Sequence, residues 1–124
     1  MYERARLERR VITPSSAAAA TVLDFGPAEG EIWRVVACNG QHDDPAAHSL
    51  NFVVVMGALV CEVTGSTSTA QYAKRVLYND WHYPEQIMLG YGDILRLNSV
   101  DAMAAGKKLY AYAVIEVLRG VVVP

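Results

Sequence analysis

The chain of 124 residues lacks the features that several classes of protein require. No apolar run approaches the roughly 20 residues that a bilayer-spanning helix needs. The run 17–20 is too short and too weakly hydrophobic for the core of a signal peptide. Eleven Lys and Arg residues stand against 13 Asp and Glu residues, which gives a formal net charge of −2. Because a nucleic-acid-binding protein needs a basic face, we expect neither nucleic acid nor a membrane as a partner.

Cysteine is scarce as well. Cys38 and Cys61 are the only two, and both lie inside apolar, strand-like runs, where a free thiol behaves as a small hydrophobic group. The pattern does not require a disulfide between them, and we expect buried thiols in a protein made inside a cell. The sequence has no Cys-x-x-Cys pair, no phosphate-binding loop and no Gly-x-Ser-x-Gly elbow. We therefore expect no enzymatic activity and no cofactor.

One cluster nevertheless has the residue types of a metal site. His42, Asp43, Asp44 and His48 fall within seven positions and offer nitrogen and oxygen ligands. Their spacing matches no strong metal motif. A cupin-like barrel enzyme would want a His-x-His pair, a following Glu and a second distant His, whereas the only other histidine is His82 in a loop. We interpret the cluster as polar loop residues around an Asp-Pro turn and predict no metal.

Two further pairs suggest catalysis only weakly. Cys38 and His42 have the residue types of a nucleophile and its base, but four residues of strand would separate them by about 13 Å. Glu29 and Glu31 flank Gly30 and could form the paired carboxylates of a glycosidase. Acids at a turn that opens a strand are far more often solvated, so we predict no catalytic residue in either pair.

Short apolar runs separated by turn residues fill the rest of the chain. In the run 31–39 we expect Trp33, Val35 and Ala37 on one face, with Cys38 on the other. Residues 39–47 and 64–71 are expected to be loops, and 72–78 fits a strand or a short helix. About eight strands without a long helical period predict an all-β, single-domain antiparallel β-sandwich or barrel. The expected strands are 20–25, 31–39, 49–56, 58–63, 87–89, 93–98 and 107–119, with 72–78 as the eighth if it is not a helix.

The two ends of the chain differ in character from this body. We expect an N-terminal arm at 1–19, a sandwich at 20–120 and a C-terminal tail at 121–124. The first ten residues of the arm are rich in arginine and are candidates for contacting an acidic protein surface. These candidates are Arg4, Arg6, Arg9 and Arg10.

The hydrophobic content of 52% exceeds what one small core hides, so we expect the chain to associate with itself. Trp81 and Tyr83 lie in a loop where aromatic side chains plug the sandwich, anchor a protein interface or stack on a sugar. The tail 121–123 either continues the last strand or adds to a neighbour's sheet edge. The interface candidates are Trp81, Tyr83, Tyr110, Tyr112, Val121 and Val123.

Three motifs carry a resemblance to a known family. They are TVLDF at 21–25, PAEGEIWRVVA at 27–37 and the Gly-Asp turn of Gly92 and Asp93 that leads into Ile94, Leu95 and Leu97. Together they resemble small virion structural proteins of tailed phages. Glu29 lengthens the first turn by one residue relative to that pattern. The His-Asp-Asp-Pro loop and the aromatic loop fall outside it.

The resemblance implies a jelly-roll β-sandwich on a virion surface. It implies a capsid decoration or cement protein, often a homotrimer, that is made in the host cytoplasm and binds the major capsid protein. The alternative is a receptor- or glycan-binding module of a head fibre or tail that uses Trp81 and Tyr83 as a stacking platform. A cupin-like metal-dependent enzyme on His42 and His48 is the least favoured alternative.

Overall fold

The computed structural model describes residues 6–17, 20–63, 67–72, 75–78 and 87–119. Within these residues the chain forms ten strands and no helix. The described residues therefore contain no helix that could cross a membrane. The strands are β1 (Arg6–Ile12), β2 (Val22–Phe25), β3 (Ile32–His42), β4 (His48–Met56), β5 (Leu59–Glu62), β6 (Thr67–Thr69), β7 (Arg75–Tyr78), β8 (Met88–Leu89), β9 (Ile94–Ser99) and β10 (Leu109–Arg119).

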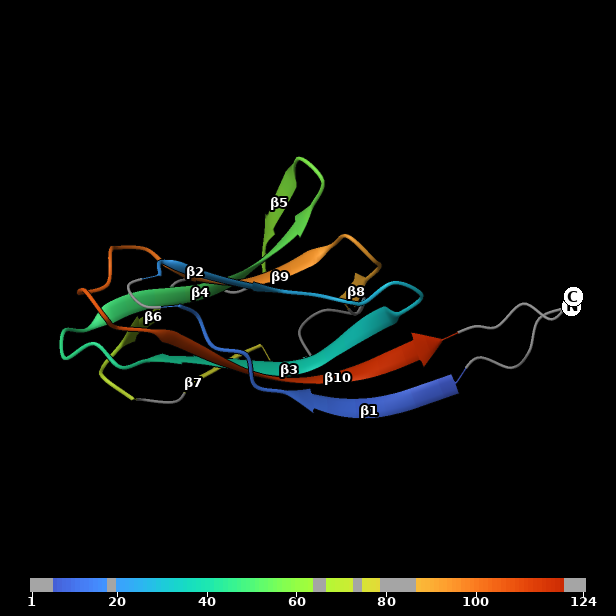
Figure 1. Ribbon diagram of the computed structural model, residues 1–124, viewed down its shortest axis with the longest axis horizontal. Helices are drawn as coiled ribbons and strands as arrows, with labels where there is room; N and C mark the ends of the chain where they lie inside the picture. Colours follow the sequence, from blue (N-terminus) through green and yellow to red (C-terminus); the bar gives the residue numbers. More distant parts are fainter. Residues whose placement is uncertain (1–5, 18–19, 64–66, 73–74, 79–86, 120–124) are drawn as a thin grey trace, which may run out of the picture.

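The strands form two antiparallel sheets that pack face to face (Figure 1). One sheet has the order β1-β10-β3-β7, and β8 also pairs with β3. The other has the order β2-β9-β4-β5, and β6 also pairs with β4. The prediction of an all-β sandwich is confirmed, and each of the eight expected strands overlaps an observed one. Residues 75–78 are strand rather than helix.

Alternating side chains from both sheets fill the core between them. In β9, for example, Leu95 and Leu97 are fully buried while their neighbours are partly exposed, which is the two-residue period of a strand with one face inward. From the opposing sheet, Ile115 and Leu109 of β10 are equally buried. The buried apolar residues are Leu23, Trp33, Val35, Cys38, Leu50, Phe52, Val54, Leu89, Leu95, Leu97, Met103, Leu109, Ala111, Ala113, Ile115 and Val117.

A bulge in β3 changes which residues face the core. Ala37 pairs with Val114 while Val35 pairs with Ile115, so Val36 is an extra residue in the ladder. Such an insertion reverses the alternation beyond it. Trp33 and Val35 are buried as expected, but the inward position then passes to Cys38, and Ala37 is only half-buried. The predicted faces of Ala37 and Cys38 were therefore wrong.

Three other expectations about the chain's organisation need correction. Residues 6–12 belong to the sandwich rather than to the expected arm, because β1 pairs with β10 along its whole length. Its charged residues suit an edge strand, where they discourage pairing with another chain. Residues 67–69 form β6 within an expected loop. Strand β3 also continues through Asn39 and Gly40 into the expected loop 39–47, as far as His42.

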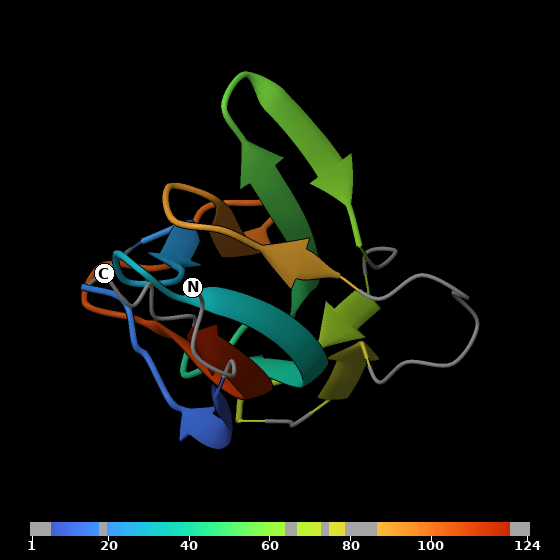
Figure 2. The same ribbon diagram turned by 90° about the vertical axis from the view of Figure 1, so that its right-hand side faces the viewer.

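The hairpin of β4 and β5 projects from the sandwich. Met56 pairs with Leu59 across a two-residue turn, and the hairpin stands away from the body in both ribbon views (Figures 1 and 2). Its tip is apolar: the exposed fractions are 37% for Met56, 59% for Leu59 and 57% for Val60. The hairpin therefore presents to solvent the kind of side chain that the core buries.

Candidate functional site

The segment between β3 and β4 carries a buried polar cluster instead of the expected solvated loop. His42 and His48 are both buried, and their ring centroids are 5.0 Å apart in an edge-to-face arrangement. His42 Nδ1 accepts a hydrogen bond from the Asp44 amide at 3.1 Å. His42 Nε2 therefore carries the proton and donates to the Thr69 carbonyl oxygen at 2.7 Å. Both ring nitrogens of His42 are thus occupied.

His48 lies between two carboxylates. Its Nε2 is 2.9 Å from Asp44 Oδ2, without the alignment of a hydrogen bond, and its Nδ1 is 3.0 Å from Asp101 Oδ1. Burial by itself would lower the pKa of His48, but Asp101 and Asp44 outweigh it and the pKa is raised. Hydrogen bonds from the backbone amides of Ala104 and Ala46 lower the pKa of Asp44 to about 2. Each carboxylate of this cluster therefore has partners within the chain.

This cluster ties loops together. Asp44, for example, connects its own loop to the loop before β10, because its Oδ2 accepts a hydrogen bond of 2.7 Å from the Ala104 amide. Within the described residues, no group of three or more His, Cys, Asp or Glu side chains is arranged to hold a metal ion. Cys38 and His42 lie four residues apart on one continuous strand, which leaves them too far apart for a nucleophile and its base.

Glu31 is the centre of a second buried cluster, so its prediction as a solvated turn residue was wrong. The turn itself forms as expected, with the Glu31 amide donating to the Ala28 carbonyl oxygen at 3.0 Å. However, the Glu31 side chain is only 5% exposed. Its Oε1 accepts from the Trp33 indole and the Ala28 amide, each at 3.1 Å. Its Oε2 accepts from Arg10 at 3.2 Å and also from Arg119.

The Glu31 cluster joins the edge strand β1 and its neighbour β10 to the turn before β3. The hydrogen bond from Arg119 is the main reason that the pKa of Glu31 falls to about 2, and the Ala28 amide, the Trp33 indole and Arg10 add to the effect against the opposing cost of burial. Glu31 thereby connects β1, β10 and β3. The two acids that suggested a glycosidase thus differ, since Glu29 is exposed.

The arginines predicted to contact a partner also differ from one another. The Arg9 side chain is 67% exposed, with Glu116 at 4.0 Å. Arg10 is engaged by Glu8 and Glu31. Arg6 belongs to β1, but its side chain lies outside the described residues. The other candidates that lie wholly outside the described residues are Arg4, Trp81, Tyr83, Val121 and Val123.

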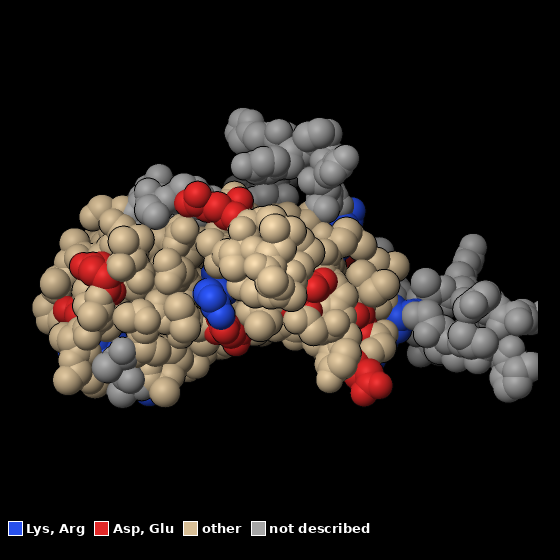
Figure 3. Space-filling view, turned by 90° about the horizontal axis from the view of Figure 1, so that it is seen from above, with Lys and Arg blue, Asp and Glu red and all other residues tan. Residues whose placement is uncertain are grey.

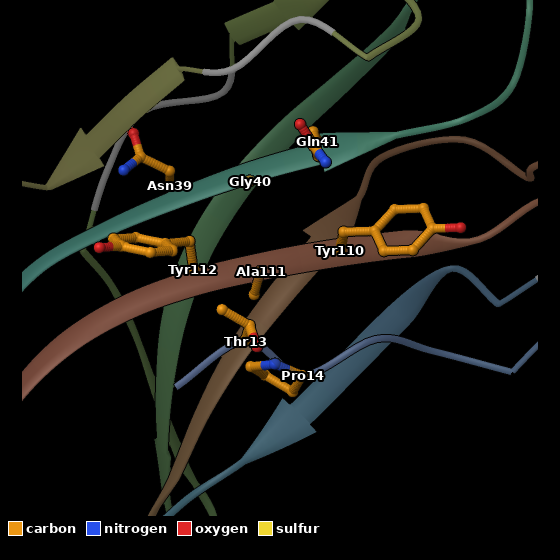
Figure 4. A pocket seen from close by; sticks show the side chains of 8 residues that line it. All are labelled: Thr13, Pro14, Asn39, Gly40, Gln41, Tyr110, Ala111 and Tyr112. Atoms are coloured by element: carbon orange, nitrogen blue, oxygen red, sulfur yellow. The ribbon is translucent and has the colours of Figure 1, made fainter. Parts of the chain in front are cut away.

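Tyr110 and Tyr112 border an open groove of about 290 Å³ on the sheet formed by β1, β10 and β3 (Figure 4). The two tyrosines lie on β10, with Gly40 and Ala111 between them along the paired strands. One side of the groove carries the amide side chains of Asn39 and Gln41. The opposite side is formed by Thr13 and Pro14.

The two rings of the groove have different environments. Tyr110 donates a hydrogen bond from its hydroxyl to Asp43 Oδ2 at 3.1 Å, and this bond raises the pKa of the tyrosine. Asp43 Oδ1 in turn accepts from the Lys108 amide at 2.7 Å, which lowers the pKa of Asp43. Tyr112 is 43% exposed. One ring is therefore fixed and the other faces solvent.

The sequence did not predict the groove because Asn39 and Gln41 fell within the expected loop 39–47. Since β3 continues to His42, these two residues instead sit directly opposite the tyrosines: Asn39 pairs with Tyr112 and Gln41 with Tyr110. The signal that would have found them is the outward alternation of 39 and 41 against that of 110 and 112. Comparison with protein families, with curated proteins and with solved structures finds no match to this chain.

Proposed function

We propose that this chain is a virion structural protein of a tailed phage. In this proposal it is a decoration or cement protein, localised to the capsid surface, that binds the major capsid protein and contacts copies of itself in a homotrimer. The sequence motifs supply the phage assignment. The structural observation that carries the self-association is the exposed apolar hairpin of β4 and β5.

The strand order supports a jelly roll. Strands β5 and β6 both pair with β4, and β7 and β8 both pair with β3, so each couple counts as one interrupted strand. The chain then has eight strand positions, four in each sheet. The late strands β10 and β9 lie between β1 and β3 and between β2 and β4, respectively. An eight-stranded double Greek key has this arrangement.

The projecting hairpin supports association between copies. Leu59 and Val60 are more than half exposed, and Met56 beside them is 37% exposed. Figure 3, which looks down on this side of the molecule, shows charged residues scattered over a surface that is otherwise mostly uncharged. Contiguous exposed apolar side chains mark interaction sites in soluble proteins. A second copy of the chain would cover them in the proposed trimer.

The ion pairs of the arginines reduce the number of candidate residues for the proposed capsid contact. Arg9 projects from β1 and is available to an acidic surface, whereas Arg10 already neutralises acids of its own chain. We therefore place the capsid contact on Arg9 and on the residues that precede β1, including Arg4.

Light scattering of the purified protein tests the self-association. We expect a trimer for the wild type and a smaller species for the double variant L59E/V60E, because buried carboxylates without partners oppose association. V100E is the matched control, since Val100 is equally exposed but lies outside the hairpin. A clean wild-type monomer at high concentration would contradict the proposal.

Purified particles of the phage that encodes this sequence test the location. We expect the chain in many copies in an electron-microscopy map of the capsid. We also expect R9E to reduce its occupancy while the control K107E does not. Removing residues 1–5 tests the preceding segment without disturbing β1, whereas removing ten residues would unpair part of β10. Particles that lack the chain, or map density confined to the tail, would rule out the decoration role.

A further inference from the structure

We propose that the groove bordered by Tyr110 and Tyr112 binds a neutral saccharide of one or two sugar rings. This function goes beyond virion assembly and is independent of the apolar hairpin. From the sequence, the two tyrosines are predicted as interface residues. The groove gives them a different role.

The tyrosine rings provide apolar surface at the correct spacing. Residues two apart on a strand lie about 6.6 Å apart on the same face, so Tyr110 and Tyr112 flank a space of roughly the width of one sugar ring. The carbon–hydrogen faces of a pyranose are apolar and pack against aromatic rings. Tyrosine suits this contact because it presents a large apolar surface with a polar tip.

The amides opposite the rings provide the polar part of the site. Asn39 and Gln41 follow the same two-residue spacing and pair directly with Tyr112 and Tyr110. Within the described part of the chain, no hydrogen bond engages either side-chain amide. Each amide offers both a donor and an acceptor, as does the Thr13 hydroxyl, and sugar hydroxyl groups need partners of both kinds.

The lining of the groove selects against a charged ligand. None of its eight residues is charged: they are Thr13, Pro14, Asn39, Gly40, Gln41, Tyr110, Ala111 and Tyr112. A phosphate, sulfate or carboxylate group would therefore have no cation to bind in the groove. Its volume of about 290 Å³ lies at the lower end of the range for small-ligand sites, which favours one or two sugar rings over an extended peptide.

The site is preorganised because the Tyr110 ring is held in place before a ligand binds. The Asp43 carboxylate holds the Tyr110 hydroxyl and is itself held by the Lys108 amide, while Gln71 donates to the Asp43 carbonyl oxygen at 2.8 Å. A side chain that is ordered before binding loses less entropy when the ligand arrives. We therefore expect Tyr110 to orient the sugar and Tyr112 to close over it.

The test is binding of the purified full chain to an array of neutral, sialylated and sulfated oligosaccharides, together with one proline-rich peptide. We expect binding to neutral hexose or N-acetylhexosamine glycans only. We expect Y112A and N39A to weaken this binding at least tenfold and Y112F to retain most of it. Y91A is the matched control, because Tyr91 is exposed but lies in the turn before β9. Thermal unfolding verifies that each variant folds.

The outcomes separate this inference from the proposed function. No binding to any neutral glycan overturns the saccharide site, as does neutral-glycan binding that folded Y112A and N39A leave unchanged. Binding of the proline-rich peptide alone also overturns it and assigns the groove to peptide recognition. Incorporation of Y112A into particles at the wild-type level, combined with lost glycan binding, supports a site separate from the assembly contacts.

Discussion

Replacing Glu31 by Gln removes the negative charge that holds Arg10 and Arg119 at the end of the sandwich. The Gln carbonyl oxygen still accepts from the Trp33 indole and from the backbone amide of the turn. Its NH₂ group, however, then faces two guanidinium groups that can only donate. E31Q therefore isolates the ionic part of the cluster and leaves its shape unchanged.

The size of the stability loss in E31Q depends on how deeply Glu31 and its two arginine partners are buried. A hydrogen bond to a charged group contributes about 1.5 to 3 kcal/mol, but Arg10 and Arg119 are 31% and 49% exposed and regain water when released. We therefore expect E31Q to lower the free energy of unfolding by about 2 kcal/mol at pH 7, well below the sum of two full hydrogen bonds. E31A also leaves the buried Trp33 indole without an acceptor, which adds about 1 to 3 kcal/mol.

The pH dependence has a defined sign. Glu31 has a folded pKa of about 2, below its ordinary value of 4.5. Its stabilising effect is therefore fully present above about pH 4.5 and is lost as the pH falls through 2. At pH 3 roughly two-fifths of the effect remains. The difference in stability between wild type and E31Q should shrink accordingly between pH 5 and pH 3.

Urea unfolding monitored by tryptophan fluorescence measures this difference directly. At neutral pH, thermal unfolding should show a decrease in Tm of about 8 °C for E31Q, given about 4 °C per kcal/mol for a chain of this size. The control is E29Q, since Glu29 is exposed on the same turn. The reasoning is refuted if E31Q and E29Q are equally stable at pH 7, or if the deficit of E31Q is undiminished at pH 3.

The remaining predictions concern a histidine and two glycines. The raised pKa of His48 means that its stabilising effect is fully present below about pH 6.5 and is lost as the pH rises through the folded pKa, so the Tm advantage of wild type over H48N should decrease from pH 6 to pH 9. G26A should cost about 1 to 3 kcal/mol in urea unfolding, because a Cβ at Gly26 would lie 2.3 Å from the Asp93 carbonyl oxygen. G90A should cost less than G26A, because the nearest atom to a Cβ at Gly90 is 3.8 Å away.

The strands and turns followed closely from local sequence. Apolar runs of period two between glycine turns located seven of the strands, and 72–78 was left open between strand and helix. The turns before β3 and β9 form as predicted, with the Asp93 amide donating to the Gly90 carbonyl oxygen at 3.0 Å. The edge strand β1 was missed because its charges resemble a solvated arm. Its pairing with β10 depends on residues at the other end of the chain, which no local pattern reveals.

The polar clusters escaped prediction for a related reason. Glu31 appears solvated within its own turn, and its burial depends on Arg10 and Arg119, which are distant in sequence. The groove depended on the length of β3, because only a strand that continues past Gly40 places Asn39 opposite Tyr112. Tertiary partners, more than local propensity, decided these positions.

The position of β10 between β1 and β3 has a consequence for the order of folding during synthesis. A ribosome releases β1 first, but its partner strand is released only after nearly all of the described chain. Until then β1 and the facing edge of β3 have no strand between them, and their backbone groups are open to other chains. Closing so long a loop is slow. We therefore expect that truncated or stalled chains ending before residue 109 aggregate. Completion of β10 covers the open edges of β1 and β3 and so prevents other chains from pairing there.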